Sequence, residues 1–279
     1  MPFRPPPEPR LIAMAGDWHG NLGFALGQVG RARDAGCELI VQCGDFGYWR
    51  PDPTTRKYLF RLERALAEAR MWLLWVDGNH EDHDLLTSRP VDSDTGLRPI
   101  SDHIAHLPRG HRWTWGEHTW LALGGAVSMD QQRRKAGVDW WAGESLTEAD
   151  VERAAAGGPA DVMVCHDAPA GPAIPDSREI QPSAEILAKA AQHREAIRTV
   201  LYATRPAALW HGHFHVRHTA TISLPPAPPL PDGPVFAIEV DRHLRVTCIV
   251  NGLAHDLADP ADNIAWVDTA GAVVGPSSD

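Results

Sequence analysis

The chain has 279 residues, of which 43% are hydrophobic and 22% are charged, and its net charge at pH 7 is −10. This composition is that of a globular protein with enough apolar residues for a sizeable core. The negative charge argues against an extended nucleic-acid-binding surface, and no apolar stretch approaches the roughly 20 residues of a membrane span.

The ends of the chain differ in composition from its middle. Residues 1–10 contain five prolines and lack the pattern of a secretory signal, so we expect a Pro-rich tail. We expect one domain over residues 11–255 and a loose, polar tail over residues 256–279. The cysteines are isolated and lie in or beside apolar runs, as buried thiols of a reducing compartment do, which predicts a cytoplasmic protein. They are Cys37, Cys43, Cys165 and Cys248.

Five apolar runs along the chain each end in residues that can bind a metal ion. The runs begin at Leu11, Leu39, Met71, Val162 and Ala207. The candidate ligands that follow them are, in chain order, Asp17 and His19, Asp45, Asn79 and His80, His166, and His213 and His215. Such runs are typical of strands buried on both faces. Because open α/β sheets bind ligands beyond the carboxyl ends of their strands, we expect these side chains to converge.

Helical periodicity lies between the first three runs. It covers residues 22–36 and 62–69, and the β-α-β-α-β order predicts a parallel sheet. Further helices are predicted over 147–156, with Thr147 as cap, and over 183–204. Hairpins are predicted around 116–117 and, after a Pro-rich loop over 225–234, between the alternating segments 236–240 and 244–250.

Residues 124–144 form a long segment that is too polar for a core strand and too long for a simple turn. Arg133 and Arg134 could bind phosphate, and Trp140 or Trp141 could stack on a ring. The alternative is a surface loop whose tryptophans pack on the edge of the sheet. We therefore treat the segment as a possible substrate-facing insertion.

The ordered motifs D-x-H, G-D, G-N-H-E, a lone His and G-H-x-H span residues 16–215 and strongly resemble those of the calcineurin-like metallophosphoesterase superfamily. The resemblance implies an α/β fold of two packed β-sheets flanked by helices, a four-layer α/β/β/α sandwich. It also implies hydrolysis of phosphate esters by a hydroxide that bridges two metal ions. Mn²⁺ is the first choice, and Fe or Zn²⁺ also suit ligands of this kind.

The resemblance assigns a role to each motif residue. The implied ligands are Asp45 as the bridge, Asp17, His19 and His215 at the first metal, and Asn79, His166 and His213 at the second. His80 matches the catalytic histidine, which would act as a general acid without binding metal. The other ten histidines are expected to be ordinary surface or core residues. These are His83, His103, His106, His111, His118, His193, His211, His218, His243 and His255.

The sequence departs from the Ser/Thr protein phosphatases of this superfamily at their two phosphate-binding arginines. Residues 46–49 replace the V-D-R-G run, and Asp77 replaces the arginine before G-N-H-E. The substrate is expected to be small and phosphorylated: a monoester, a diester or a nucleotide pyrophosphate. Protein phosphatase-like activity and a non-catalytic scaffold remain alternatives, and the oligomeric state stays open.

Tyr48 stands three residues after Asp45, where purple acid phosphatases carry a G-D-x-x-Y tyrosinate that binds Fe(III). The match is partial, because that branch has D-x-G where this chain has His19 in D-x-H. A phenol with a pKa of about 10 would need a trivalent ion to displace its proton. We expect Tyr48 to pack beside the site.

Overall fold

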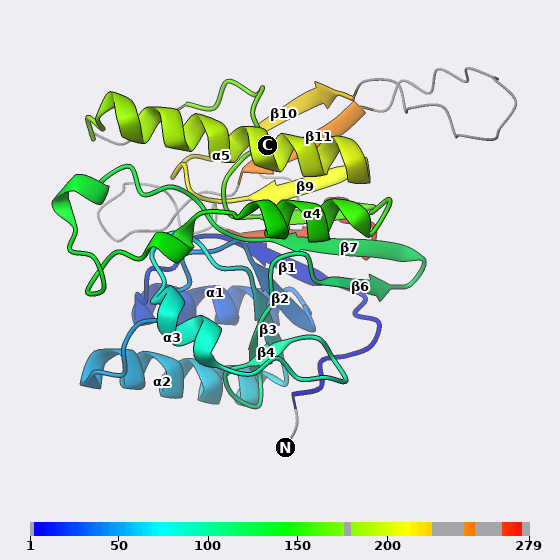
Figure 1. Ribbon diagram of the computed structural model, residues 1–279. Helices are drawn as coiled ribbons and strands as arrows, with labels where there is room; N and C mark the ends of the chain where they lie inside the picture. Colours follow the sequence, from blue (N-terminus) through cyan, green and yellow to red (C-terminus); the bar gives the residue numbers. More distant parts are fainter. Residues whose placement is uncertain (1–2, 176–179, 225–242, 249–263, 275–279) are drawn as a thin grey trace, which may run out of the picture.

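The computed structural model describes residues 3–175, 180–224, 243–248 and 264–274. Within these residues, two six-stranded sheets lie face to face and helices cover the outer face of each (Figure 1). The four-layer α/β/β/α sandwich expected from the resemblance is therefore confirmed. None of the described helices is long and apolar enough to cross a membrane.

The first sheet has the strand order β12-β1-β2-β3-β5-β4. Its strands are β1 (Ile12–Ala15), β2 (Leu39–Gln42), β3 (Trp72–Trp75), β4 (Arg98–Pro99), β5 (Ile104–His106) and β12 (Ile264–Val267). Strands β1, β2, β3 and β5 run parallel, as the β-α-β-α-β order predicts, and antiparallel strands close both edges. Strands β4 and β5 are too short to give a sequence signal.

The second sheet has the strand order β10-β11-β9-β8-β7-β6. Its strands are β6 (Arg112–Trp115), β7 (His118–Leu123), β8 (Val162–Cys165), β9 (Ala208–His211), β10 (His218–Ser223) and β11 (His243–Cys248). Strands β6 and β7 form the hairpin predicted around residues 116–117. Strands β7, β8, β9 and β11 run parallel.

The second predicted hairpin lies only partly within the described residues. Strand β11, in its second segment, pairs antiparallel with β10 and parallel with β9. Its first segment, residues 236–240, and the Pro-rich loop over 225–234 lie outside the described residues. Alternation indicates a strand but not its partner, and β10 was not predicted.

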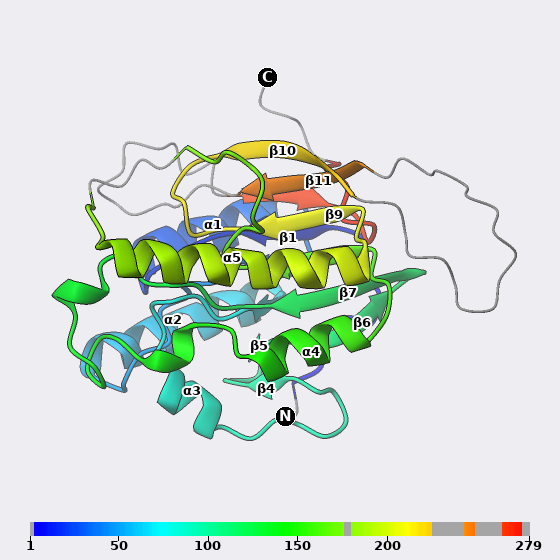
Figure 2. The same ribbon diagram turned by 45° about the horizontal axis from the view of Figure 1, so that its top comes forward.

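Helices pack on the outer faces of both sheets (Figure 2). They are α1 (Leu22–Asp34), α2 (Pro53–Ala69), α3 (His83–Ser88), α4 (Glu148–Ala156) and α5 (Ala184–Thr204). Helix α2 is longer than its apolar periodicity predicted, because Asp52 caps it and Pro53 opens its first turn. The predicted cap of α4 is confirmed: Thr147 and Asp150 exchange hydrogen bonds as a capping box.

Three apolar layers hold these elements together. One lies between the two sheets and includes Trp120 and Trp210. Another lies between the first sheet and helices α1 and α2, and the third lies between the second sheet and helices α4 and α5. Because strands β1, β2, β3, β8 and β9 are buried on both faces, their carboxyl ends are held on a rigid frame.

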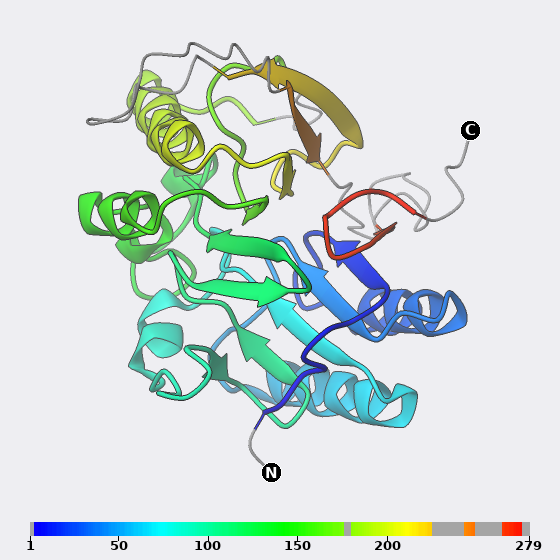
Figure 3. The ribbon, with the colours of Figure 1, turned by 90° about the vertical axis from the view of Figure 1, so that its right-hand side faces the viewer.

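Both terminal segments contribute to the core, which corrects the expected loose C-terminal tail. Strand β12 pairs with β1 along its whole length, and Figure 3 shows this last strand beside the first one. The physical reason is the apolar run Ile264–Val267, a short strand within an otherwise polar stretch. In the Pro-rich tail, Phe3 is buried between the sheets.

Candidate metal centre

The loops that follow β1, β2, β3, β8 and β9 meet at one edge of the two sheets, and we call them the strand-end cradle. Backbone hydrogen bonds join its members: Asp17 N donates to Gly44 O at 3.2 Å, and His19 N donates to Asp45 O at 2.7 Å. The two sheets are joined by His213 N, which donates to Asp17 Oδ1 at 3.0 Å. The predicted convergence of strand-end side chains is therefore what the fold produces.

The backbone of the cradle is strained where its ligands stand. Among the described residues, seven non-glycine residues have a positive φ, and two of them, Arg70 and Arg205, end helices α2 and α5. The other five are all predicted metal ligands: Asp17, His19, Asp45, His213 and His215. Such a conformation costs on the order of 1–3 kcal/mol per residue and clusters at functional sites.

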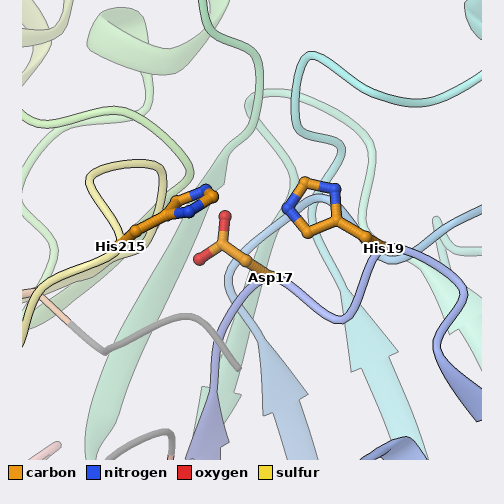
Figure 4. A group of neighbouring side chains, drawn as sticks. All are labelled: Asp17, His19 and His215. Carbon is orange, nitrogen blue, oxygen red and sulfur yellow. The ribbon is translucent and has the colours of Figure 1, made fainter. Parts of the chain in front are cut away.

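Asp17, His19 and His215 form one group of candidate ligands. Each offers an atom within 4.8 Å of the others, and Figure 4 shows the carboxylate of Asp17 between the two imidazole rings. His19 Nε2 is buried and has no hydrogen-bond partner among the described residues. A buried nitrogen without a partner is costly, and a bound cation would satisfy it.

Asp45 lies between this group and a second one. Its Oδ2 is 3.6 Å from His19 Nε2 and 3.3 Å from His166 Nε2, while its Oδ1 accepts a hydrogen bond from His80 N at 2.9 Å. Burial alone would raise the pKa of Asp45, but the surrounding histidines hold it well below its usual range. One oxygen atom thus faces histidines that the resemblance assigns to two different metals.

The second group consists of Asn79, His166 and His213. His166 Nδ1 donates to the carbonyl oxygen of Cys43 at 2.7 Å, which leaves Nε2 facing Asn79 Oδ1 at 3.1 Å. The ring centroids of His166 and His213 are 5.1 Å apart. Burial would lower the pKa of His166, but the carboxylates, Asp45 foremost, raise it to about 10.

These groups fit the metals that the resemblance implies. The donor atoms are carboxylate and amide oxygens and imidazole nitrogens, without thiolate, as Mn²⁺, Fe or Zn²⁺ prefer. The raised pKa of His166 shows that the buried carboxylates stabilise positive charge at this place. A pair of cations would supply that charge and leave the imidazoles neutral.

Glu81, the last residue of G-N-H-E, fastens two loops of the cradle to each other. It is fully buried, and its carboxylate accepts hydrogen bonds from Gly47 N at 3.1 Å and Gly78 N at 2.6 Å. Burial and the nearby Asp45 raise its pKa to about 8. A side chain at Gly78 would collide with the carboxylate of Asp45, which explains the glycine. Glu81 was not among the site residues predicted from sequence.

His80, which the resemblance assigns to neither metal, lies close enough to His19 and Asp45 that one donor atom of each of the three is within 4.8 Å of the others. Its Nε2 is 3.9 Å from Asp45 Oδ2, its ring centroid is 4.8 Å from that of His19, and Trp49 Nε1 donates to its carbonyl oxygen. Arg134 Nη2 lies 2.7 Å from its Nδ1 and 3.0 Å from its Nε2. Burial lowers the pKa of His80 well below its usual value.

Of the four residues singled out in the segment 124–144, the structure brings Arg134 to the centre. Its Nε also donates to Asp130 Oδ1 at 2.8 Å, which holds the guanidinium in place. Arg133 is exposed, Trp140 is half-buried, and Trp141 is buried within the protein. The segment contains two short 3-10 helices, Gln131–Arg133 and Ala142–Glu144.

The same segment supplies two buried residues that the sequence analysis missed. Asn79 Nδ2 donates to Ser128 Oγ at 3.1 Å, and Ser128 Oγ donates to Glu144 Oε2 at 2.5 Å. Ser128 N donates to Glu144 Oε1 at 2.9 Å. Burial raises the pKa of Glu144 to about 7. No local pattern marks these residues, since Ser128 meets Asn79 across 49 positions of sequence.

Asp77, which replaces a phosphate-binding arginine, is itself paired inside the protein. Arg109 Nη2 donates to Asp77 Oδ2 at 2.6 Å, and His106 Nε2 lies 3.1 Å from Asp77 Oδ1. These partners, Arg109 foremost, outweigh burial and hold the pKa of Asp77 well below its usual range. Asp77 is thus part of the structural support behind the cradle.

The remaining sequence expectations concern packing. Tyr48 is buried in the core layer of the first sheet, with its ring centroid 6.0 Å from that of Trp75. Among the other histidines, His103 lies against Glu63 and His193 Nδ1 against Asp167, while His193 Nε2 is buried without a hydrogen-bond partner among the described residues. His255 and the side chain of His243 lie outside the described part of the chain.

Comparison with known proteins places the chain. No curated protein sequence matches it. Its fold resembles that of TT1561 from Thermus thermophilus, at 14% identity and a TM-score of 0.51, covering 94% of this chain and 99% of that one. It also resembles a dimetal phosphatase from Danio rerio, at 12% identity and a TM-score of 0.55, covering 93% and 92%. The profile of the calcineurin-like phosphoesterases matches residues 11–217, and the chain therefore belongs to that family.

Proposed function

We propose that this protein is a hydrolase of small phosphate esters that works with two metal ions sharing Asp45. The observation that carries the proposal is the place of Asp45 Oδ2, within 3.6 Å of His19 Nε2 and 3.3 Å of His166 Nε2. A dimetal phosphatase among the structural neighbours supports it. Asp17, His19 and His215 would hold one ion with Asp45, and Asn79, His166 and His213 would hold the other.

Bound ions, with Mn²⁺ preferred and Fe or Zn²⁺ also suitable, would supply Lewis acidity and lower the pKa of a bound water. The protein provides the proton for the leaving group. Arg134 Nη2 faces both ring nitrogens of His80, at 2.7 Å from Nδ1 and 3.0 Å from Nε2, and we propose that the ring donates its proton through Nε2. That nitrogen is on the side of Asp45, where it can donate to the departing alkoxide.

Arg134 also gives the site a fixed positive charge. Its side chain is largely buried and is held by Asp130, so it is positioned before substrate arrives. We propose that it attracts the phosphoryl oxygens while the exposed Arg133 and the half-buried Trp140 contact the rest of the substrate. The buried thiols of Cys37 and Cys165 form no disulfide among the described residues, which supports a reducing compartment such as the cytoplasm.

The test is an ester panel with metal-stripped protein reloaded separately with Mn²⁺, Zn²⁺ and Fe²⁺. The substrates are p-nitrophenyl phosphate, bis(p-nitrophenyl) phosphate, a dinucleoside pyrophosphate and a phosphoserine peptide. We expect metal-dependent hydrolysis of at least one small ester and the lowest rate on the peptide, because Asp77 is paired with Arg109 where protein phosphatases carry an arginine. Two bound ions without any turnover would instead favour the scaffold alternative.

A further inference from the structure

We propose that Glu144, acting through Ser128, fixes the orientation of the Asn79 amide so that Asn79 presents its oxygen to the second metal ion. The proposal rests on the metal centre of the proposed function and adds a positioning residue to it. An asparagine side chain carries an oxygen that binds cations and an NH₂ group that repels them. A half-turn about its last bond exchanges the two, so something must select the orientation.

The selection follows from the direction of the hydrogen bonds. Above about pH 7, the value to which burial raises its pKa, Glu144 is ionised and only accepts, so it takes the N–H of Ser128 on Oε1 at 2.9 Å and its hydroxyl proton on Oε2 at 2.5 Å. Because the single hydroxyl proton of Ser128 is donated to Glu144, Ser128 Oγ can only accept a hydrogen bond from Asn79. Asn79 must therefore turn its NH₂ group toward Ser128, at 3.1 Å, and its Oδ1 toward His166.

The carboxylate of Glu144 is held in place by the protein around it. Arg109 donates to the carbonyl oxygens of Gly143 at 2.8 Å, Glu144 at 3.0 Å and Ser145 at 2.8 Å. Arg109 is anchored in turn by Asp77, two residues before Asn79. Glu144, the first residue of this hydrogen-bond relay, is thus fixed to the same strand end that carries Asn79, the last one.

Glutamine at position 144 would reverse the relay. The backbone N–H of Ser128 can only donate, so the glutamine must place its oxygen there and its NH₂ group against Ser128 Oγ. Ser128 would then donate to Asn79, which would turn its oxygen away from the metal and its NH₂ group toward it. Ser128→Ala removes the relay without reversing it, so its effect should be smaller.

The experiment is calorimetric titration of metal-stripped protein with Mn²⁺ at pH 8, where Glu144 is ionised, and it requires no substrate. Wild type should bind two ions. Glu144→Gln should weaken the binding of one ion by about 10–100-fold, as substitutions of residues that support a metal ligand do, and leave the binding of the other ion unchanged. Ser128→Ala should weaken the same site by less. Glu148→Gln, the same change at an exposed carboxylate four residues later, serves as the control and should match wild type.

A double-mutant cycle separates orientation from mere structural support. Aspartate at position 79 has an oxygen at both ends, so in an Asn79→Asp background Glu144→Gln should cost nothing or strengthen binding, since Ser128 could then donate to the new carboxylate. An equal loss in both backgrounds would mean that Glu144 is only structural. If circular dichroism shows Glu144→Gln to be unfolded, Ser128→Ala decides, and an unchanged affinity there would overturn the proposal.

The failure of this inference differs from the failure of the proposed function. If wild type binds no metal, the metal centre is wrong and the relay falls with it. If wild type and Glu144→Gln bind both ions with equal affinity, the centre stands and the orienting role of Glu144 is wrong.

Discussion

The strand-end cradle and the segment 124–144 reach the same centre by different means. In the cradle, the position of each predicted ligand is set by the backbone: strands end at a common edge, five of the predicted ligands have positive φ, and the loops form hydrogen bonds to one another through N–H groups. The segment contains only short 3-10 turns and reaches the centre through the side chains of Ser128, Arg134 and Glu144. We infer that the cradle residues would hold the ions, whereas the segment 124–144 would orient the groups around them and supply a positive charge.

The largest effect is expected at the middle of the cradle. Asp45→Asn should abolish turnover and reduce the metal content at both sites, because one oxygen of Asp45 faces both ligand groups. Elemental analysis and the ester assay measure this, with Asp34→Asn on the surface of α1 as control. If Asp45→Asn retains two ions and near-normal turnover, Asp45 does not bridge.

A smaller effect is expected where the cradle and the segment meet. His80→Ala should retain both ions and lower turnover by about 10²–10⁴-fold on esters with poor leaving groups. Activated aryl esters should lose less, because their leaving group needs no proton. Loss of metal would make His80 a ligand, and equal losses on both kinds of ester would exclude the general-acid role.

The segment itself offers a matched pair of neighbouring arginines. Arg134→Ala should lower kcat/KM by about 10–100-fold, because a hydrogen bond to a charged group contributes roughly 1.5–3 kcal/mol. Arg133→Ala should change it by no more than about twofold on a small ester, since the exposed Arg133 can contact only larger substrates. Equal losses of kcat/KM for the two variants would mean that Arg134 has no special role at the centre.

The smallest effect is expected on the free energy of unfolding of the metal-free protein. The folded protein keeps a proton on Glu144 up to about pH 7, whereas its unperturbed pKa is 4.5. Between these values the folded state binds more protons, so this group lowers the free energy of unfolding as the pH rises. Glu144→Gln removes that penalty and should gain about 3 kcal/mol on wild type between pH 4.5 and 7.5. Urea titrations of stripped protein measure the difference, which should be absent in Glu148→Gln.

The same contrast explains what could be predicted from sequence. The cradle is local: each predicted ligand follows an apolar strand, with a glycine between them at Asp17 and Asp45, so these two residues and His166 could be placed at strand ends from the sequence alone. Glu144 and Ser128 act across long sequence separations, within a segment without periodicity. Strand β12 was missed because four apolar residues in a polar stretch give too weak a signal, and the partner of β11 depended on a strand that was not recognised.

The pairing of β12 with β1 also determines when one edge of the first sheet becomes paired during synthesis. During synthesis β1 leaves the ribosome among the first elements, and β12 follows every predicted ligand. Until then one edge of β1 exposes unpaired N–H and C=O groups, directly before the loop that carries Asp17. An open edge of this kind invites pairing with other chains. The nascent protein is therefore prone to aggregate through this edge until residues 264–267 close the sheet.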